Sequence, residues 1–202
     1  MQSEAFDGDV AKLLRRCRPK NRRSAISLAL AHAAFEHAVS QRVLLKAGLS
    51  GTAMALCRLQ FEAVVRAAWT GQGASEKWLD AFSAPMEGEG NKEPVMGPPI
   101  PAMLDAFAEH APHVAAEFRR LYGTIAAMHS FVHSGAQAVA HAMMGGYPTE
   151  KLTSALHNRN LLQWFTANCA VVVAQDPLLA PRMQLLLEKH GACMPPIDRF
   201  TR

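Results

Sequence analysis

One apolar stretch, residues 50–70, most constrains how this chain folds. Arg58, Glu62 and Arg66 follow one another in it at steps of four residues, and Trp69 comes three residues later. Steps of three or four bring side chains to one face of a helix, so the stretch predicts a helix with its charges on one side. The rest of its circumference is apolar, which is typical of a buried helix. We therefore expect the charges to line an interior seam, with Glu62 buried against Arg58 or Arg66, because unpaired buried ions are costly.

The composition favours an all-helical protein. Half of the 202 residues are apolar and only 7% are aromatic. Ala, Leu and Met are abundant, whereas runs of β-branched residues are rare. The length allows one sizeable core and does not require a second domain. We predict an all-α fold, a single-domain bundle of four or five long helices with short accessory helices.

Capping residues and helix breakers divide the chain into elements. Ser24 predicts the start of a helix that runs to Lys46, Gly48 ends this helix, and Ser50 caps the next one. The short link between these two helices predicts that they are antiparallel neighbours. Ser75 caps a short helix over residues 76–82. Further helices are expected at 102–110, 112–144 and 149–175, with a final amphipathic helix ending near 191.

The helical bundle is expected to occupy residues 24–191. Residues 1–23 are predicted to form a flexible segment, acidic at first and then basic, and residues 192–202 an irregular tail. The Pro and Gly residues of 84–101 predict a long loop, either a lid over a site or a disordered excursion.

The positive charge is concentrated in one short run. Six of the 21 basic residues lie within residues 15–23, which leaves 15 basic residues against 17 acidic ones in the rest of the chain. The body of the protein is therefore close to neutral. A solvated linker and a polyanion-binding arm are the two interpretations of the basic run.

Several classes of protein are disfavoured. The four cysteines are scattered, so they predict neither a disulfide framework nor a zinc site. The first residues lack the apolar core of a secretory signal, and no apolar run is long enough to span a bilayer comfortably. We expect a cytoplasmic protein that does not enter the membrane.

A second polar surface is predicted in a segment without formal charge. Residues 121–149 contain no Asp, Glu, Lys or Arg. On a helix, His129 and His133 share a face with Tyr122 and Gln137. Because an ordinary solvated face carries Lys and Glu, we expect this one to pack against protein, in the seam or in a dimer contact.

Three roles fit the two histidines. They could ligate a metal if Glu62 or His37 supplied a further ligand. One imidazole could act as a general acid or base or contact a ligand. Both could instead be hydrogen-bonded core residues. Neither an HExxH nor an ExxH motif is present, so we assign no metal and no cofactor.

The charged stripe has a structural and a functional interpretation. A buried Arg–Glu–Arg triad can fix helix register without any chemistry. Arginine is also the residue best suited to bind a phosphate or carboxylate. The residues predicted to be catalytic are His133, His129 and Glu62. The residues predicted to bind the ligand are Arg58, Arg66, Tyr122 and Gln137.

The segments 55–69 and 131–135 carry a family resemblance. They read ALCRLQFEAVVRAAW and FVHSG, and residues 41–144 resemble a group of uncharacterised bacterial helical proteins with this pattern. More remotely, the chain looks like the HEPN class of helical bundles, many of which are dimeric ribonucleases that use an Arg and a His. In that class the Arg lies four to six residues before the His on one helix, whereas Arg119 and Arg120 lie further from His129.

We therefore expect a homodimeric bundle whose seam binds an anionic small molecule or an RNA end. The resemblance implies one alternative, a HEPN-like endoribonuclease. The structural interpretation of the charged stripe implies the other, a protein-interaction module without catalytic activity.

Overall fold

The computed structural model describes residues 2–84 and 97–195. Within these ranges the chain forms ten α-helices and one 3₁₀ turn, with no β-strand, which confirms the all-α single-domain bundle. Most of the expected lid or loop, and most of the expected tail, lie outside the described residues. The helices are α1 (Gln2–Leu14), α2 (Arg22–Lys46), α3 (Ser50–Gln72), α4 (Glu76–Ser83), α5 (Ile100–Ala108), α6 (Pro112–Ala126), α7 (His129–Val132), α8 (Ala136–Met143), α9 (Thr149–Ala174) and α10 (Ala180–His190), and the 3₁₀ turn is Gly191–Cys193.

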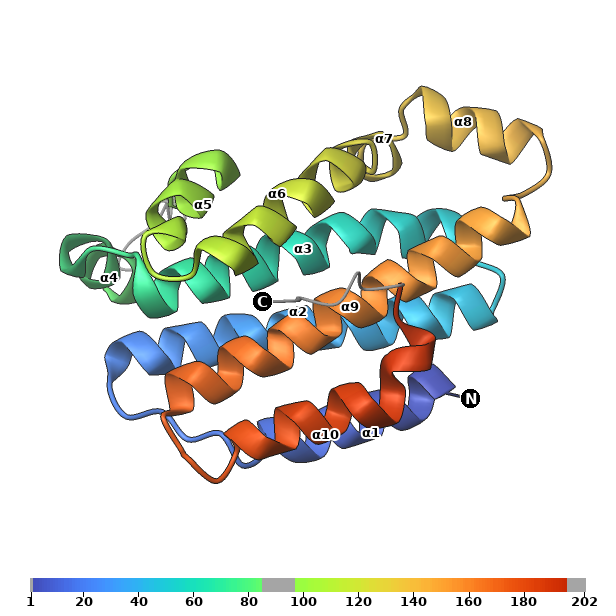
Figure 1. Cartoon of the computed structure of the whole chain (residues 1–202). Coiled ribbons are helices and arrows are strands. Elements are labelled where there is room, and N and C mark those ends of the chain that lie inside the picture. The colour runs from blue at the N-terminus through green and yellow to red at the C-terminus, as the bar shows by residue number, and fades with distance from the viewer. Residues whose placement is uncertain (1, 85–96, 196–202) are drawn as a thin grey trace.

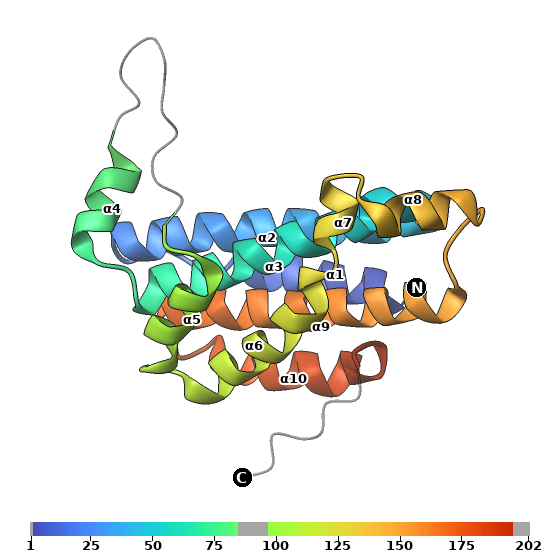
Figure 2. The ribbon, with the colours of Figure 1, turned by 90° about the horizontal axis from the view of Figure 1, so that it is seen from above.

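Three long helices form the centre of the bundle. α2, α3 and α9 pack on one another and run along most of the molecule, and α2 and α3 form the expected antiparallel pair (Figure 1). α1 and α10 lie side by side and pack on α9, whereas α5 and α6 pack on α3. α7 and α8 lie over the first half of α3, at the end opposite to α4 (Figure 2).

Two apolar clusters fill the spaces between these helices. One lies between α1, α2, α9 and α10 and contains Phe6, Leu28 and Val171. The other lies between α3, α5, α6 and α9 and contains Phe61 and Trp69. Such burial is the main source of stability in a helical bundle, because isolated helices of this length are marginal in water.

Local signals place the helix starts with small differences from expectation. The Asn21 side chain accepts a hydrogen bond from the backbone of Ser24, and the Ser24 hydroxyl accepts one from the backbone of Asn21. This reciprocal cap moves the start of α2 to Arg22, ahead of the expected Ser24. Ser75 caps α4 as expected. Ser50 is the first residue of α3 and does not cap it with its side chain.

The N-terminal segment differs from expectation, because residues 2–14 form helix α1. Phe6, Val10 and Leu13 recur at steps of four and three, and all three are buried. These steps bring them to one face, which α9 and α10 cover. Acidic residues between them mask this periodicity when the segment is judged by composition alone.

A buried ion pair fixes α1 against α2 and α9. The Arg159 side chain is fully buried, and it donates hydrogen bonds to Asp7, to the Ala38 carbonyl at 2.7 Å and to the Asn160 side chain at 2.6 Å. Asp7 also accepts a 2.7 Å bond from Arg42 on α2. Burial lowers the pKa of Arg159, and the Asp7 charge opposes this shift.

The segment expected as one helix over 112–144 is three helices. α6 ends at Ala126, and the chain turns again after α7 because Ser134 adopts a left-handed φ of 51°. At this turn the Gly135 backbone donates to the Ser130 carbonyl at 2.7 Å. A Cβ atom on Gly135 would lie 2.7 Å from the Ser130 hydroxyl oxygen, so a larger residue would not fit without a shift. The Ser134-Gly135 pair therefore directs α8 away from the line of α6.

Replacing Asp7 by Ala is expected to lower the free energy of unfolding by about 3 to 5 kcal/mol, because it leaves the Arg159 charge buried without its carboxylate. Urea denaturation of the purified variant measures this loss. Asp9→Ala on the same helix is the control and is expected to cost about 1 kcal/mol, because its ion pairs lie nearer to solvent. Adding Arg159→Met to Asp7→Ala should recover part of the loss. Equal losses in the two single variants would contradict the role assigned to the pair.

Candidate functional site

Arg58 and Glu62 form an ion pair on the first half of α3. The Arg58 Nε atom donates to Glu62 Oε1 at 2.7 Å. The two side chains are 30% and 26% exposed, respectively. The expected pairing is confirmed, but the expected burial of Glu62 is wrong. The covering helix ends at Ala126, so this part of α3 remains open to solvent.

α7 brings His129 to the same place. The distance between Arg58 Nη1 and His129 Nδ1 is 2.6 Å. A guanidinium group can only donate, so Nδ1 is the acceptor in this contact. The His133 ring lies beside that of His129, with ring centroids 4.2 Å apart. We call the four residues Arg58, Glu62, His129 and His133 the α3–α7 seam.

The seam is open to solvent in the single chain, so the expected packing inside the bundle is wrong, whereas the expected dimer contact stays a prediction. Both histidines are exposed, so they are not the core residues considered as one alternative. Other positions of residues 121–149 are also exposed in the single chain, including Val139 at 49% and Met143 at 84%. The break after α6 explains this, because it carries α7 and α8 off the axis along which a continuous helix would have packed.

The remaining predicted site residues lie at different distances from the seam. The Tyr122 ring stacks on Phe61 of α3, with ring centroids 5.9 Å apart. Arg66 is half-buried, one turn after Glu62 on α3. Gln137 lies in the first turn of α8, where its backbone donates to the Ser130 hydroxyl at 3.0 Å and its side chain is exposed. α3 and α6 thus place Arg66 and Tyr122 near the ion pair, whereas α8 leads Gln137 away from it.

A metal site at His129 and His133 would need a further ligand, and the part of the chain that the structure describes supplies none beside them. No group of three or more His, Cys, Asp or Glu side chains there could hold a metal ion. His37, considered as a ligand, lies on α2 and is half-buried, and this burial lowers its pKa.

The structure divides the basic run of residues 15–23 into two groups. Arg22 and Arg23 belong to α2 and form ion pairs with Glu76 and Asp80 of α4. These pairs attach α4 to the start of α2, so this part of the run has a structural role. Arg15 and Arg16 follow α1 and line a pocket that α10 closes from the other side.

Comparison with known proteins places the chain in a family. Residues 31–196 match the family of unknown function DUF6988. The chain belongs to this family. The match includes every residue of the α3–α7 seam, and it confirms the resemblance to an uncharacterised helical family. Neither a curated protein nor a solved structure matches the chain. Among the described helices, none has the length and apolar character needed to cross a membrane.

Replacing Glu62 by Ala is expected to lower the free energy of unfolding by about 0.5 to 1 kcal/mol, because the ion pair with Arg58 is partly solvated. Urea denaturation at low and at high salt measures this loss, and about 1 M NaCl should reduce it by screening. A loss as large as that expected for Asp7→Ala would show that the seam is a buried structural element.

Proposed function

We propose that the α3–α7 seam binds the phosphate group of a small organic anion or of an RNA end. The observation that carries this proposal is the fixed and partly exposed guanidinium group of Arg58. Glu62 holds its Nε atom and His129 holds its Nη1 atom. These bonds use two of its five N–H donors, which leaves donors for a ligand. Because the side chain is already ordered, ligand binding costs little further entropy.

Each residue of the seam has a role in the proposal. Arg58 and Arg66 bind the anion, since the planar fork of a guanidinium group matches two phosphate oxygens. Glu62 orients Arg58. His133 is the hydrogen-bonding or acid–base group, because it is exposed beside His129 and an imidazole changes charge near neutral pH. Tyr122 contributes an aromatic edge that a base or other ring could contact.

The second candidate is a HEPN-like endoribonuclease acting in the cytoplasm. The contact between Arg58 and His129 favours it, because an exposed Arg–His pair combines charge stabilisation with acid–base capacity. In this chain the pair joins two helices, whereas the HEPN pattern places both residues on one helix. We therefore propose binding first and expect weak or no general ribonuclease activity.

We also propose that α7 and α8 form the contact of a homodimer. Val132, Val139, Met143 and Met144 are exposed on these helices, at 37%, 49%, 84% and 68%. In a two-fold dimer a surface faces its own copy, so any charge on it would lie near an identical charge. Residues 121–149 carry no formal charge and would avoid this repulsion. In the third alternative, a non-catalytic interaction module, the same surface would bind another protein.

Arg58→Ala is expected to weaken phosphate binding at the seam by about tenfold or more, because it removes charge-assisted hydrogen bonds. The measurement is the affinity of the wild type and the variant for a short RNA with a 5′-phosphate and for the same RNA with a 5′-hydroxyl. The wild type should prefer the phosphorylated RNA. Arg119→Ala, which removes another exposed Arg–carboxylate pair, is the matched control and should leave this preference unchanged.

Cleavage is measured with the same RNAs and with a longer unstructured RNA, with and without divalent ions. Metal-independent cleavage that is lost in His133→Ala, at an unchanged melting temperature, would replace the binding proposal with the ribonuclease. Equal affinity for the two RNA ends, unchanged by Arg58→Ala, would contradict phosphate recognition at the seam.

Met143→Glu is expected to convert the dimer to a monomer, because two added carboxylates would face each other across an apolar contact. Light scattering after gel filtration, at several protein concentrations, measures the mass. Leu178→Glu is the control, since Leu178 is 76% exposed and lies between α9 and α10. A monomeric wild type at every concentration would contradict the homodimer.

A further inference from the structure

A pocket between α1 and α10 gathers basic side chains from both ends of the chain. Its volume is about 500 Å³, within the usual range of sites for small molecules. The two helices that form it lie side by side, although their sequences are more than 150 residues apart (Figure 1). Its basic side chains are Lys12, Arg15, Arg16, Arg182 and Lys189.

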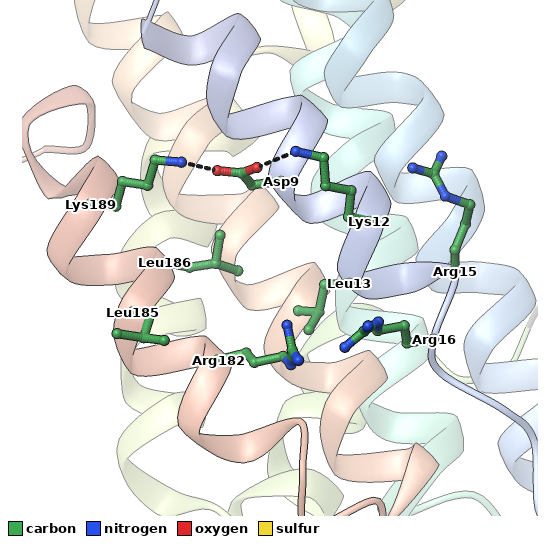
Figure 3. A pocket seen from close by; sticks show the side chains of 9 residues that line it. All are labelled: Asp9, Lys12, Leu13, Arg15, Arg16, Arg182, Leu185, Leu186 and Lys189. Carbon is green, nitrogen blue, oxygen red and sulfur yellow. Dashed lines mark hydrogen bonds and ion pairs between the residues drawn. The ribbon is translucent and has the colours of Figure 1, made fainter.

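One carboxylate lies among these five basic groups, and it is already in use. Asp9 accepts hydrogen bonds from Lys12 at 3.0 Å, from Lys189 at 2.7 Å and from His190 at 3.0 Å. These bonds hold the pKa of Asp9 well below its ordinary value, with Lys189 the largest cause. Figure 3 shows the chain of contacts from Lys189 through Asp9 to Lys12 along one edge of the pocket. The ion pairs of Asp9 are with Lys12, Lys189 and His190, so Asp9 does not neutralise the three arginines of the pocket.

The arginines of the pocket have no carboxylate partner in the described part of the chain. Arg22, Arg42 and Arg119 each form an ion pair elsewhere in the structure. Arg16 points toward Arg182 in the lower part of the pocket, whereas Arg15 points away from them (Figure 3). A bound anion would supply the counter-charge that the described residues do not give to Arg16 and Arg182.

The floor of the pocket is apolar. Leu13 and Leu186 are buried beneath the charges, and Leu185 is 60% exposed at its side. Leu185 lines the same pocket as Arg16 and Arg182, so it offers contact to an apolar group of a ligand that binds there. The pocket therefore combines charge for an anion with apolar surface for the part of the ligand that carries it.

We propose that this pocket binds a small organic polyphosphate, such as a nucleoside triphosphate, with its phosphates on Arg16 and Arg182 and its apolar part on Leu185. A single carboxylate would neutralise only one guanidinium group, whereas a di- or triphosphate carries enough charge for both. A long nucleic acid fits less well, because its backbone requires a continuous basic track and the body of the chain is nearly neutral. This site is separate from the α3–α7 seam.

Calorimetric titration of the full chain with ATP, inorganic triphosphate and adenosine tests the proposal. ATP should bind most tightly, inorganic triphosphate more weakly and adenosine without measurable heat. The double variant Arg16→Gln, Arg182→Gln should bind ATP about tenfold or more weakly, because each guanidinium group supplies charge-assisted bonds. Leu185→Ser should reduce the advantage of ATP over inorganic triphosphate and leave the binding of the latter unchanged.

The matched control is Arg18→Gln. Arg18 is an exposed residue of the same basic run that does not line the pocket, so its loss tests for a general effect of charge. This variant should bind ATP like the wild type. Arg58→Ala, which removes any binding at the seam, should keep the ATP binding that the double variant loses. Arg16, Arg18, Arg182 and Leu185 are exposed and Arg58 is partly exposed, and a melting curve for each variant verifies that it folds.

Four results would overturn the proposal. The first is the absence of saturable binding of both ATP and inorganic triphosphate to the wild type. The second is an equal loss of affinity in Arg18→Gln and in the double variant. The third is tight binding of single-stranded RNA without binding of ATP, which would indicate an extended polyanion. Loss of ATP binding in Arg58→Ala alone would assign the phosphate to the seam and also exclude this pocket.

Discussion

The buried ion pair between Arg159 and Asp7 is the interaction on which the arrangement of the helices depends. Arg159 lies inside α9, where its charge would be very unfavourable without a carboxylate. Asp7 supplies that carboxylate from α1, and the bonds to Ala38 and from Arg42 include α2 in the same contact. α1 is thereby held against α2 and α9, and α10 then has a surface on which to pack. The pocket between α1 and α10 therefore depends on this buried ion pair, although neither Arg159 nor Asp7 lines it.

Two Arg–carboxylate pairs of similar chemistry have different roles because their burial differs. The Arg159 pair is surrounded by protein, so its donors are used within the fold. The Arg58–Glu62 pair is about one-third exposed, and Arg58 also contacts His129 while retaining unused donors. Burial makes the first pair a structural element. Exposure gives the second the capacity to bind a ligand.

The folded chain also divides its positive charge by position. The later arginines of the basic run form ion pairs that attach α4 to α2, whereas Arg16 lines the pocket beside α1 together with Arg182. The seam lies over α3 and the pocket between α1 and α10, on different sides of the bundle (Figure 1). The two proposed anion sites can be tested separately, because no residue of the seam lines the pocket.

The sequence by itself determined the helical class, the antiparallel pair α2 and α3, and the pairing of Glu62 with an arginine one turn away on its own helix. These features follow from steps of three and four residues and from short links, which are local in the chain. The site was predicted in part, because the step of four also places His129 beside His133. The end of α6 at Ala126 was not predicted from the sequence, whereas Ser134-Gly135 was a local signal for the second turn, after α7.

Only the tertiary structure decided which polar groups are buried. Asp7 is one acidic residue among several near the N-terminus, and nothing in its local pattern predicts a partner 152 residues later. The openness of the seam and the presence of Arg16 and Arg182 in one pocket likewise depend on how distant helices pack. Burial and ion pairing between distant segments are set by the distance between side chains in space, which local periodicity does not specify.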